Sequence, residues 1–457
     1  MAITTINPAT GETLATYEHM PRTQVLAILG AVAEAQRAWA ESPVRDRAGL
    51  FHELAAVLRR QQQDHAELMS REMGKPITEA RGEVEKCAWL CEVYADHAER
   101  WLAEEAVEAD GLKHRVIYEP LGVVLSIMPW NYPYWQALRF AVPTLCAGNA
   151  GILKHASNVT GCSLAIEQLF RDAGFPDDLF RSVLADHATV GELIADSRVR
   201  GVSLTGSTEA GERIAEAAGR HLKKVVLELG GSDPFIVLED ADIEVAARNA
   251  VKGRMLCTGQ SCIAAKRFIV VRRQADVFVA RFAALMAGLK LGDPLDEATE
   301  VGAIVNEGAL DELIEQIDDA VHRGAHVLAG GQRADRAGIF LEPTVLSGVA
   351  QDMRVIREEV FGPVAPVIVV EDEDEAVRVA NDSPFGLGGS VWTRDLERGE
   401  RVARRLASGT VFVNSITKSD PRMPFGGIKQ SGIGRELSWF GLREFCNIKG
   451  LNIYEHG

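Results

Sequence analysis

The sequence lacks the short motifs that mark the most familiar metal and nucleotide sites. No C-x-x-C pair is present, and neither a G-x-G-x-x-G loop after a strand nor a G-x-x-x-x-G-K-[ST] loop occurs. The seven cysteines stand at irregular spacing, unlike a disulfide framework. We therefore expect no metal site, no disulfide-stapled fold and no standard phosphate loop, but free thiols in a reducing cytoplasm.

Net positive charge is lacking as well, because 65 acidic residues outnumber 49 basic ones and give a net charge of −16. A surface of this sign repels nucleic acids and anionic membranes, so we expect neither as a partner. The N-terminus has no signal-peptide character. Prolines and polar residues interrupt the most apolar stretch, residues 121–153, which predicts buried strands and turns and no membrane span.

The order of apolar patterns predicts an α/β fold. Residues 1–100 show helical periodicity, and from Val116 onward short apolar strands alternate with helical segments such as residues 162–173 and 210–221. Such alternation is typical of a doubly wound parallel sheet. The pattern starts again after Gly230 and Gly231, which predicts two α/β lobes. The C-terminal residues alternate like an edge strand and are expected to pair across a subunit interface.

Cys262 lies in the stretch TGQSCIAAKRF, residues 258–268. Taken alone, such a cysteine is a core residue, half of a disulfide, a metal ligand or a nucleophile. No histidine lies near it in sequence, which weakens the metal interpretation.

Three further features each have a functional and an ordinary interpretation. Asn131, held between two prolines, is either an oxyanion donor or a turn residue. Glu228, between an apolar strand and two glycines, is either a general base of raised pKa or a salt-bridged strand end. Gly206 and Ser207 open a helix, where they bind an anion or act as an ordinary cap.

In combination these features resemble the nicotinamide-dependent aldehyde dehydrogenase family. The resemblance runs from INPATGE near the N-terminus to PFGGIKQSGIGRE near the C-terminus and covers almost the whole chain. Its most specific pieces occur in the family's order: PWN, GSTEAG, LELGG, GQSC, EEVFGPV and PFGG-K-SG-GRE. The resemblance implies the family's fold, with two doubly wound α/β lobes and a β-strand oligomerisation arm.

The resemblance also implies a catalytic set. Cys262 is the implied nucleophile, which forms a thiohemiacetal and then a thioester, and Asn131 with the Cys262 N–H holds the oxyanion. Glu228 is implied to activate the water that hydrolyses the thioester. The implied cofactor-binding residues are Trp130, Lys154, Ser157, Gly206, Ser207, Glu359 and Phe361.

Arg139 suggests the substrate. In the family's succinate-semialdehyde dehydrogenases an arginine at this position binds the distal carboxylate, and a guanidinium suits a carboxylate well. The alternative is an arginine paired with a structural carboxylate. A second arginine of those enzymes is replaced by Leu256, so Ser419 and Arg422 are candidates for the second anchor. We expect succinic semialdehyde as the substrate, with another aliphatic or aromatic aldehyde as the alternative.

Ser157 and Cys257 are two departures from the common family pattern. Ser157 stands where NAD-specific relatives tend to carry a glutamate, which favours NADP and leaves NAD acceptable. Cys257 lies five positions before Cys262 and is either a redox partner in a reversible disulfide or a buried spectator.

The expected organisation follows from the same resemblance. Residues 1–100 and 120–230 form the dinucleotide-binding domain, residues 231–441 the catalytic domain, and residues 101–119 and 442–457 the oligomerisation segments. We expect a cytoplasmic homodimer or homotetramer.

Overall fold

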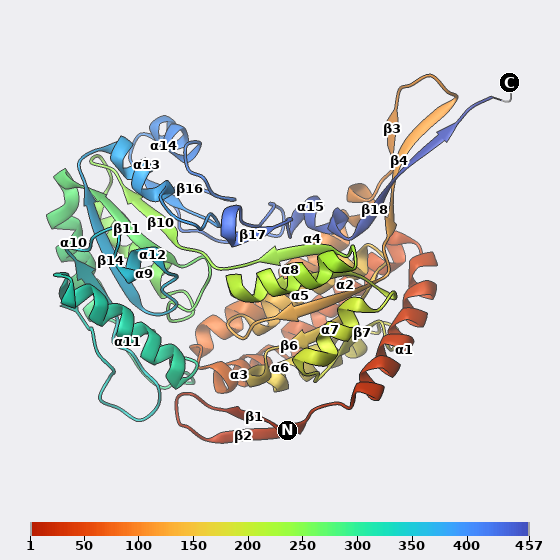
Figure 1. Cartoon of the computed structure of the whole chain (residues 1–457), viewed down its shortest axis with the longest axis horizontal. Helices are drawn as coiled ribbons and strands as arrows, with labels where there is room; N and C mark the ends of the chain where they lie inside the picture. The colour runs from red at the N-terminus through yellow and green to blue at the C-terminus, as the bar shows by residue number, and fades with distance from the viewer. Residues whose placement is uncertain (1, 456–457) are drawn as a thin grey trace.

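The computed structural model describes residues 2–455, so Met1 and residues 456–457 lie outside the description. Two α/β lobes lie side by side, and an extended arm projects from the body at the upper right of Figure 1. The predicted α/β class, with two lobes and a β-strand arm, is confirmed.

The N-terminal region combines a hairpin with four helices. Helical periodicity correctly predicts the helices, which are α1 (Arg22–Glu41), α2 (Val44–Arg60), α3 (Gln62–Met73) and α4 (Ile77–Trp101). The prediction is wrong for the first 18 residues, where β1 (Ala2–Ile6) and β2 (Thr13–Glu18) pair antiparallel. These strands are largely exposed and rich in threonine, so they carry no apolar alternation that sequence reading detects.

The first lobe contains a six-stranded sheet in the order β17-β9-β8-β5-β6-β7. Its strands are β5 (Val123–Met128), β6 (Ala150–His155), β7 (Phe180–Ser182), β8 (Val199–Thr205), β9 (Lys224–Glu228) and β17 (Gly432–Ile433). All neighbours are parallel except β17, which returns from far along the chain and pairs antiparallel with β9. The connecting helices are α5 (Pro133–Cys146), α6 (Thr160–Asp172), α7 (His187–Ala195) and α8 (Thr208–Arg220), with a 3-10 turn at Ser157–Val159.

Helix α5 corrects the prediction of strands and turns across residues 121–153. Every residue of this helix is buried, so its sequence is apolar on all sides and lacks the one-sided period of a surface helix. Pro133 begins the helix, and Pro143 lies inside it. In residues 2–455 no helix is long and apolar enough to cross a membrane.

The second lobe contains a seven-stranded sheet in the order β12-β13-β14-β11-β10-β15-β16. Its strands are β10 (Asp233–Val237), β11 (Ala265–Val271), β12 (His326–Ala329), β13 (Thr344–Ser347), β14 (Val364–Val370), β15 (Ser390–Trp392) and β16 (Phe412–Val413). Only β12 runs antiparallel to its neighbour. The helices are α9 (Ile243–Met255), α10 (Arg272–Ala287), α11 (Glu307–His322), α12 (Arg354–Arg357), α13 (Glu373–Asn381) and α14 (Leu396–Ala403).

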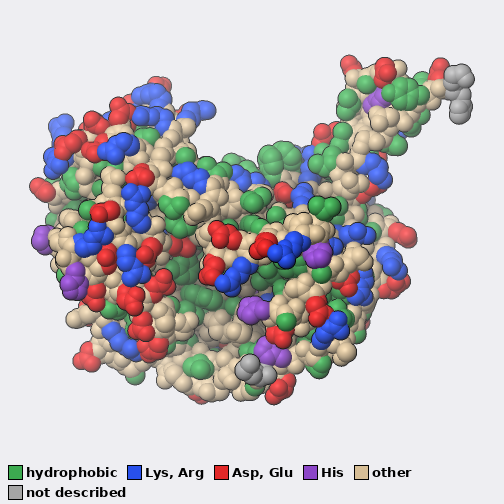
Figure 2. All heavy atoms as spheres, viewed as in Figure 1, with side chains coloured by type: hydrophobic (Ala, Val, Ile, Leu, Met, Phe, Trp, Pro, Cys, Tyr) green, Lys and Arg blue, Asp and Glu red, His purple; other side chains and the backbone are tan. Residues whose placement is uncertain are grey.

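The arm is a three-stranded antiparallel sheet of β3 (Glu105–Val107), β4 (Lys113–Pro120) and β18 (Cys446–Ile453). The short helix α15 (Ser438–Glu444) leads into β18. Figure 2 shows hydrophobic side chains along this projecting arm, and Ile448 and Tyr454 are more than half exposed. The predicted C-terminal edge strand is therefore present, and the division into functional domains stays a prediction.

Candidate active site

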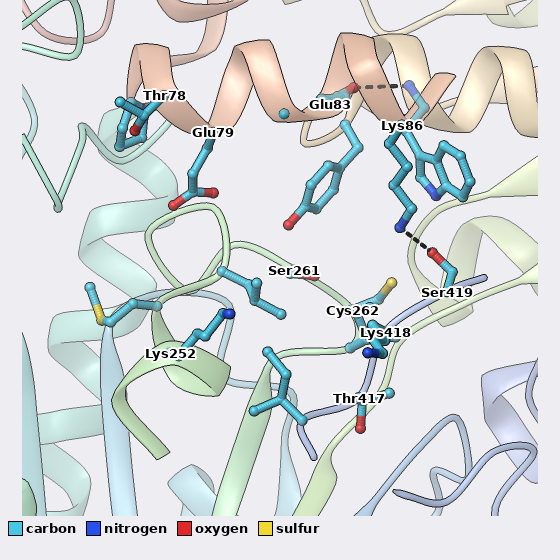
Figure 3. A pocket seen from close by; sticks show the side chains of 18 of the residues that line it. Thr78, Glu79, Glu83, Lys86, Lys252, Ser261, Cys262, Thr417, Lys418 and Ser419 are labelled. Carbon is cyan, nitrogen blue, oxygen red and sulfur yellow. Dashed lines mark hydrogen bonds between the residues drawn. The ribbon is translucent and has the colours of Figure 1, made fainter. Parts of the chain in front are cut away.

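A cavity of about 620 Å³ lies where the two lobes meet, and Cys262 is part of its wall. Figure 3 shows the cavity with α4 above it and the loop of Cys262 below. Helices α5 and α9 and the segment 416–419 supply the remaining wall. The wall is mostly apolar with a few charged groups, which is the usual character of a small-molecule site.

The loop of Cys262 connects α9 to β11 through a left-handed turn. Cys257, Thr258 and Gly259 have φ values of 54°, 57° and 79°. Two buried cations hold the carbonyl groups of the loop: Arg254 donates to Gly259 and Ala265, and Lys266 Nζ donates to the Ser261 and Cys262 carbonyls, both at 2.8 Å. This tethering fixes the backbone of the loop from beneath.

The Cys262 thiol is half-buried and has a raised pKa. Burial raises the pKa to about 11, while the positive charges of Lys266 and Arg139 oppose the shift. The thiol is therefore protonated near neutral pH, and nucleophilic attack requires removal of its proton.

Asn131 follows β5 and lies directly against the Cys262 loop. Its Nδ2 donates to the Gln260 carbonyl at 2.9 Å, and its Oδ1 accepts from Gln136 at 3.1 Å. Two N–H bonds belong to Nδ2, so one remains for another acceptor. Helix α5 starts beside Asn131 because the Glu83 carboxylate accepts the backbone N–H groups of Tyr134 and Trp135, both at 2.9 Å.

Glu228 ends β9 and is buried, as its apolar surroundings in sequence predict. Neither carboxylate oxygen has a protein hydrogen-bond partner among the described residues. Burial raises the pKa of Glu228 well above its ordinary range, and the nearby charge of Glu436 raises it further. Gly426, at φ 150°, lies so close that an added Cβ would be 2.7 Å from the Glu228 Oε1.

Arg139 extends from α5 into the cavity wall and is buried. Its Nε lies 2.5 Å from Glu436 Oε2, and its Nη2 donates to Thr205 at 3.2 Å. The Arg139 Nε–H bond is not directed at the Glu436 oxygen, so the contact between the two side chains is an ion pair. The structural pairing that sequence analysis left open as an alternative is thus present, and Arg139 still faces the cavity.

Ser419 also lines the cavity, whereas Arg422 does not. Arg422 is exposed and pairs with Asp420, so it does not provide the second anchor. The residue that donates to Ser419 is Lys86 of α4, whose Nζ lies 2.6 Å from the Ser419 Oγ (Figure 3). Sequence reasoning missed Lys86. The sequence feature that could have identified Lys86 is the spacing of Glu79, Glu83 and Lys86, which puts three charged residues on one face of a helix.

The neighbours of Cys262 named from sequence occupy different places. Leu256 and Met255 line the cavity, so an apolar pair stands where a second cation was considered. Cys257 is fully buried, and its Sγ donates to the Asn131 carbonyl at 3.3 Å. Burial raises the pKa of Cys257 to about 12. These features are those of a spectator thiol, and a Cys257–Cys262 disulfide stays a prediction.

A second hollow, of about 370 Å³, contains Lys154 and Ser157. Burial lowers the pKa of Lys154. No carboxylate lies within 4.0 Å of its Nζ in the chain from residue 2 to 455. Ser157 is exposed, and His19 and His187 also line the hollow. An unpaired ammonium beside a free hydroxyl suits an anionic or polyhydroxyl ligand.

The remaining expected cofactor residues lie on both lobes. Gly206 and Ser207 open α8, where the exposed Ser207 caps the helix through its Oγ, which accepts from Ala210 at 3.2 Å. Trp130 and Phe361 contact edge to face at 5.8 Å. The Glu359 carboxylate accepts from the Gly231 N–H at 2.9 Å and lies 3.3 Å from Lys266.

Comparisons with known proteins agree with these features. The sequence matches the profile of the aldehyde dehydrogenase family over residues 1–451. It is 46% identical over 444 residues to succinate semialdehyde dehydrogenase [NAD(P)+] of Escherichia coli, covering 97% of this chain and 96% of that protein. It is 46% identical over 455 residues to succinate-semialdehyde dehydrogenase [NADP(+)] 1 of Mycobacterium tuberculosis, covering 98% and 99%.

Solved structures agree as well. The crystal structure of succinic semialdehyde dehydrogenase from Streptococcus pyogenes, in complex with NADP+ as the cofactor, superposes with a TM-score of 0.97 at 37% identity. The alignment covers 99% of this chain and 100% of that one.

Proposed function

The chain belongs to the aldehyde dehydrogenase family, and we propose that it oxidises succinic semialdehyde to succinate with a nicotinamide dinucleotide as hydride acceptor. The observation that carries the proposal is the cavity, in which the thiol of Cys262 shares a wall with Arg139 and Ser419. A thiol is a suitable nucleophile for an aldehyde carbon, and a cation in the same wall is suited to a carboxylate.

In this proposal the Cys262 thiol gives up its proton to solvent, and its Sγ attacks the aldehyde carbon and forms a thiohemiacetal. The developing oxyanion is held by the free N–H of Asn131 Nδ2 and by the Cys262 backbone N–H, which makes no hydrogen bond within the described residues. Donors that are fixed before the reaction stabilise developing charge without reorganisation. The tethered loop and the capped start of α5 keep both donors in place.

Glu228 is the proposed base. Its two carboxylate oxygens have no protein partner, so the ionised group is available to accept a proton from a water molecule that hydrolyses the thioester. Because burial raises its pKa, ionised Glu228 binds a proton more readily than an exposed glutamate does.

The residues of the second hollow fit a dinucleotide. Lys154 offers an unpaired cation, Ser157 a free hydroxyl, and the start of α8 its N-terminal N–H groups with Ser207 at the surface. Glu359 and Phe361 lie between this region and Cys262 in the proposed arrangement. When bound, the nicotinamide supplies the acceptor for the hydride lost by the aldehyde carbon.

We propose NADP as the preferred cofactor, with NAD also accepted. Ser157 adds no negative charge beside Lys154, and the carboxylate that does line the hollow, Asp186, accepts from the Thr189 N–H as the cap of α7. The E. coli and M. tuberculosis relatives are named for NAD(P)+ and NADP(+), which supports this choice.

The arm is the proposed oligomerisation surface. Its strand β18 has exposed apolar residues, among them Ile448 and Ile453, and an edge of this kind is usually covered. We propose a homodimer or homotetramer, which light scattering on the purified protein tests.

Initial rates test the substrate. We expect kcat/KM for succinic semialdehyde to exceed that for propanal and benzaldehyde by at least about 30-fold, because a carboxylate held by buried polar groups discriminates strongly against analogues that lack it. Parallel assays with NADP and NAD test the cofactor. Equal kcat/KM for propanal and succinic semialdehyde would contradict the substrate proposal and leave only a general aldehyde dehydrogenase.

A further inference from the structure

Helix α4 contacts both segments that supply the proposed oxyanion donors. Its Glu79 extends toward the loop of Cys262 and accepts the Cys257 N–H at 2.8 Å (Figure 3). One turn further along α4, Glu83 accepts two backbone N–H groups at the start of α5, just after Asn131. The two donor segments are therefore held against the same helix.

Glu83 is the cap of α5, although it belongs to another helix. The N-cap residue of α5, Tyr132, makes no side-chain cap hydrogen bond, and Pro133 has no N–H. The next two N–H groups, those of Tyr134 and Trp135, both donate to the Glu83 Oε1 at 2.9 Å. Because the first turn of a helix needs such acceptors, one carboxylate oxygen fixes where α5 begins.

The first turn of α5 in turn holds the Asn131 amide. Gln136 of this turn donates its Nε2 to the Asn131 Oδ1 at 3.1 Å, and Asn131 itself lies two positions before Pro133, the first residue of α5. One Nδ2 hydrogen of Asn131 is taken by the Gln260 carbonyl, so the planar amide leaves a single direction for the other. A displacement of the start of α5 moves Gln136 and Asn131 together and redirects that N–H.

Lys75, two positions before α4, holds the other oxygen of Glu83. Its Nζ forms a buried ion pair with the Glu83 Oε2 and lies 3.9 Å from the centre of the Tyr132 ring. Burial disfavours the ammonium, yet the negative groups around it, Glu83 first among them, leave the pKa of Lys75 above its ordinary value. Both oxygens of Glu83 are thus engaged, one by α5 and one by Lys75.

We infer that Glu83, held by Lys75, is a positioning residue of the reaction, which sets the direction of the Asn131 N–H that faces the oxyanion. This inference rests on the proposed function, in which Asn131 is an oxyanion donor, and deepens it. An oxyanion donor acts only within about 2.7–3.1 Å of the developing charge, so a small shift of α5 slows the reaction. The thiol of Cys262 is unaffected, because Glu83 acts through α5 alone.

The test compares two variants that both remove the buried charges and differ in one acceptor. In Lys75→Met/Glu83→Gln the amide oxygen still accepts the N–H groups of α5, and no ammonium faces its NH2 group. In Lys75→Met/Glu83→Met a side chain of similar size offers no acceptor. Replacement of a buried ion pair by uncharged groups is often neutral for stability.

The measured quantity is kcat/KM for succinic semialdehyde at saturating NADP. The glutamine variant should stay within about threefold of the parent. The methionine variant should lose at least about tenfold, a part of the 100- to 1,000-fold that complete removal of an oxyanion donor costs. Glu83→Asp, which withdraws the acceptor by one methylene, serves with the same expected loss if the methionine variant does not fold.

Two readouts separate positioning from a loss of stability. Alkylation by iodoacetamide forms no oxyanion, so its rate at Cys262 should agree within about threefold in both variants. Cys262 is the one cysteine of residues 2–455 that is not buried, so the reaction reports on it. In an Asn131→Ala background the methionine variant should cause less than about a twofold further loss of kcat/KM, because residues that act as a unit are not additive.

Glu72→Met is the matched control. The buried Glu72 carboxylate accepts the Gly161 and Cys162 N–H groups at 2.8 and 3.0 Å, so it caps α6 as Glu83 caps α5. Its removal should lower the urea concentration of unfolding as the methionine variant at Glu83 does, and keep kcat/KM within about threefold. An equal loss of kcat/KM in Glu72→Met would assign the effect to stability and overturn the inference.

The outcomes separate the two proposals. If the methionine variant at Glu83 keeps kcat/KM within threefold, or loses as much in the Asn131→Ala background as in the parent, the inference is overturned and the proposed function stands. If Asn131→Ala itself keeps the parent's activity, the proposed oxyanion donor fails and the inference fails with it. A parent that oxidises propanal equally well overturns only the substrate, and the same comparison is then made with propanal.

Discussion

The cavity beside Cys262 and the hollow beside Lys154 differ in how their charged groups are held. In the hollow, Lys154 near the end of β6 and Ser157 just after it lie three positions apart, and neither is tied to a charged partner. In the cavity, the charged groups come from distant parts of the chain, and several, such as Arg139, are already paired. The hollow can therefore be understood from a short motif, whereas the cavity requires knowledge of which charges balance one another.

The two regions also differ in expected role: the hollow binds the cofactor, and the residues around the cavity carry out the reaction. The hollow offers half-exposed groups that suit a large soluble ligand, and changes there should alter which cofactor binds. Cys262 in the cavity wall and the buried Glu228 both have raised pKa values, and changes at these residues should alter the reaction.

The largest expected effect comes from Cys262→Ser, which should lower kcat by at least about 1,000-fold because removal of a nucleophile abolishes the covalent step. The affinity for NADP, measured by isothermal titration calorimetry, should change little, since the hollow is untouched. An activity above a tenth of the parent's would show that Cys262 is not the nucleophile.

Arg139→Met should reduce stability by about 3 kcal/mol, because it leaves the buried Glu436 without its cation. Adding Glu436→Gln to the same chain should recover much of the loss, which urea unfolding of the two variants measures. If both variants unfold at the same urea concentration as the parent, the Arg139–Glu436 pair does not balance charge as we describe.

Ser157→Glu tests the hollow beside Lys154, where a change should alter cofactor choice and leave the cavity untouched. A carboxylate at this exposed position should repel a 2′-phosphate and lower the ratio of kcat/KM for NADP over NAD at least about tenfold. Ser157→Gln, of similar size and no charge, is the control. An unchanged ratio in the glutamate variant would place the 2′-phosphate elsewhere.

Much of the fold was predictable because strands and helices alternate with clear apolar patterns from Val116 onward. Helix α5 was not, because a helix buried on all sides has no amphipathic period, and its prolines suggest a break. The β1–β2 hairpin was missed because its polar, threonine-rich strands show no apolar alternation.

The site shows the same division. Asn131, Glu228 and Cys262 stand in short motifs, so their chemistry was visible in sequence. Lys86 stands in no such motif, and Glu436, although it ends PFGGIKQSGIGRE, was assigned no role from sequence; their contacts depend on α4 and the segment before α15 meeting α5 in space. Sequence named the reactive groups, and only the structure paired the charges around them.

The most direct test of this account is a crystal structure of the Cys262→Ala protein with NADP and succinic semialdehyde. We predict the substrate carboxylate within about 3 Å of both the Arg139 guanidinium and Ser419 Oγ, with the aldehyde carbon beside residue 262. A carboxylate bound at the exposed rim by Lys252 or Lys418, with the aldehyde away from residue 262, would contradict it.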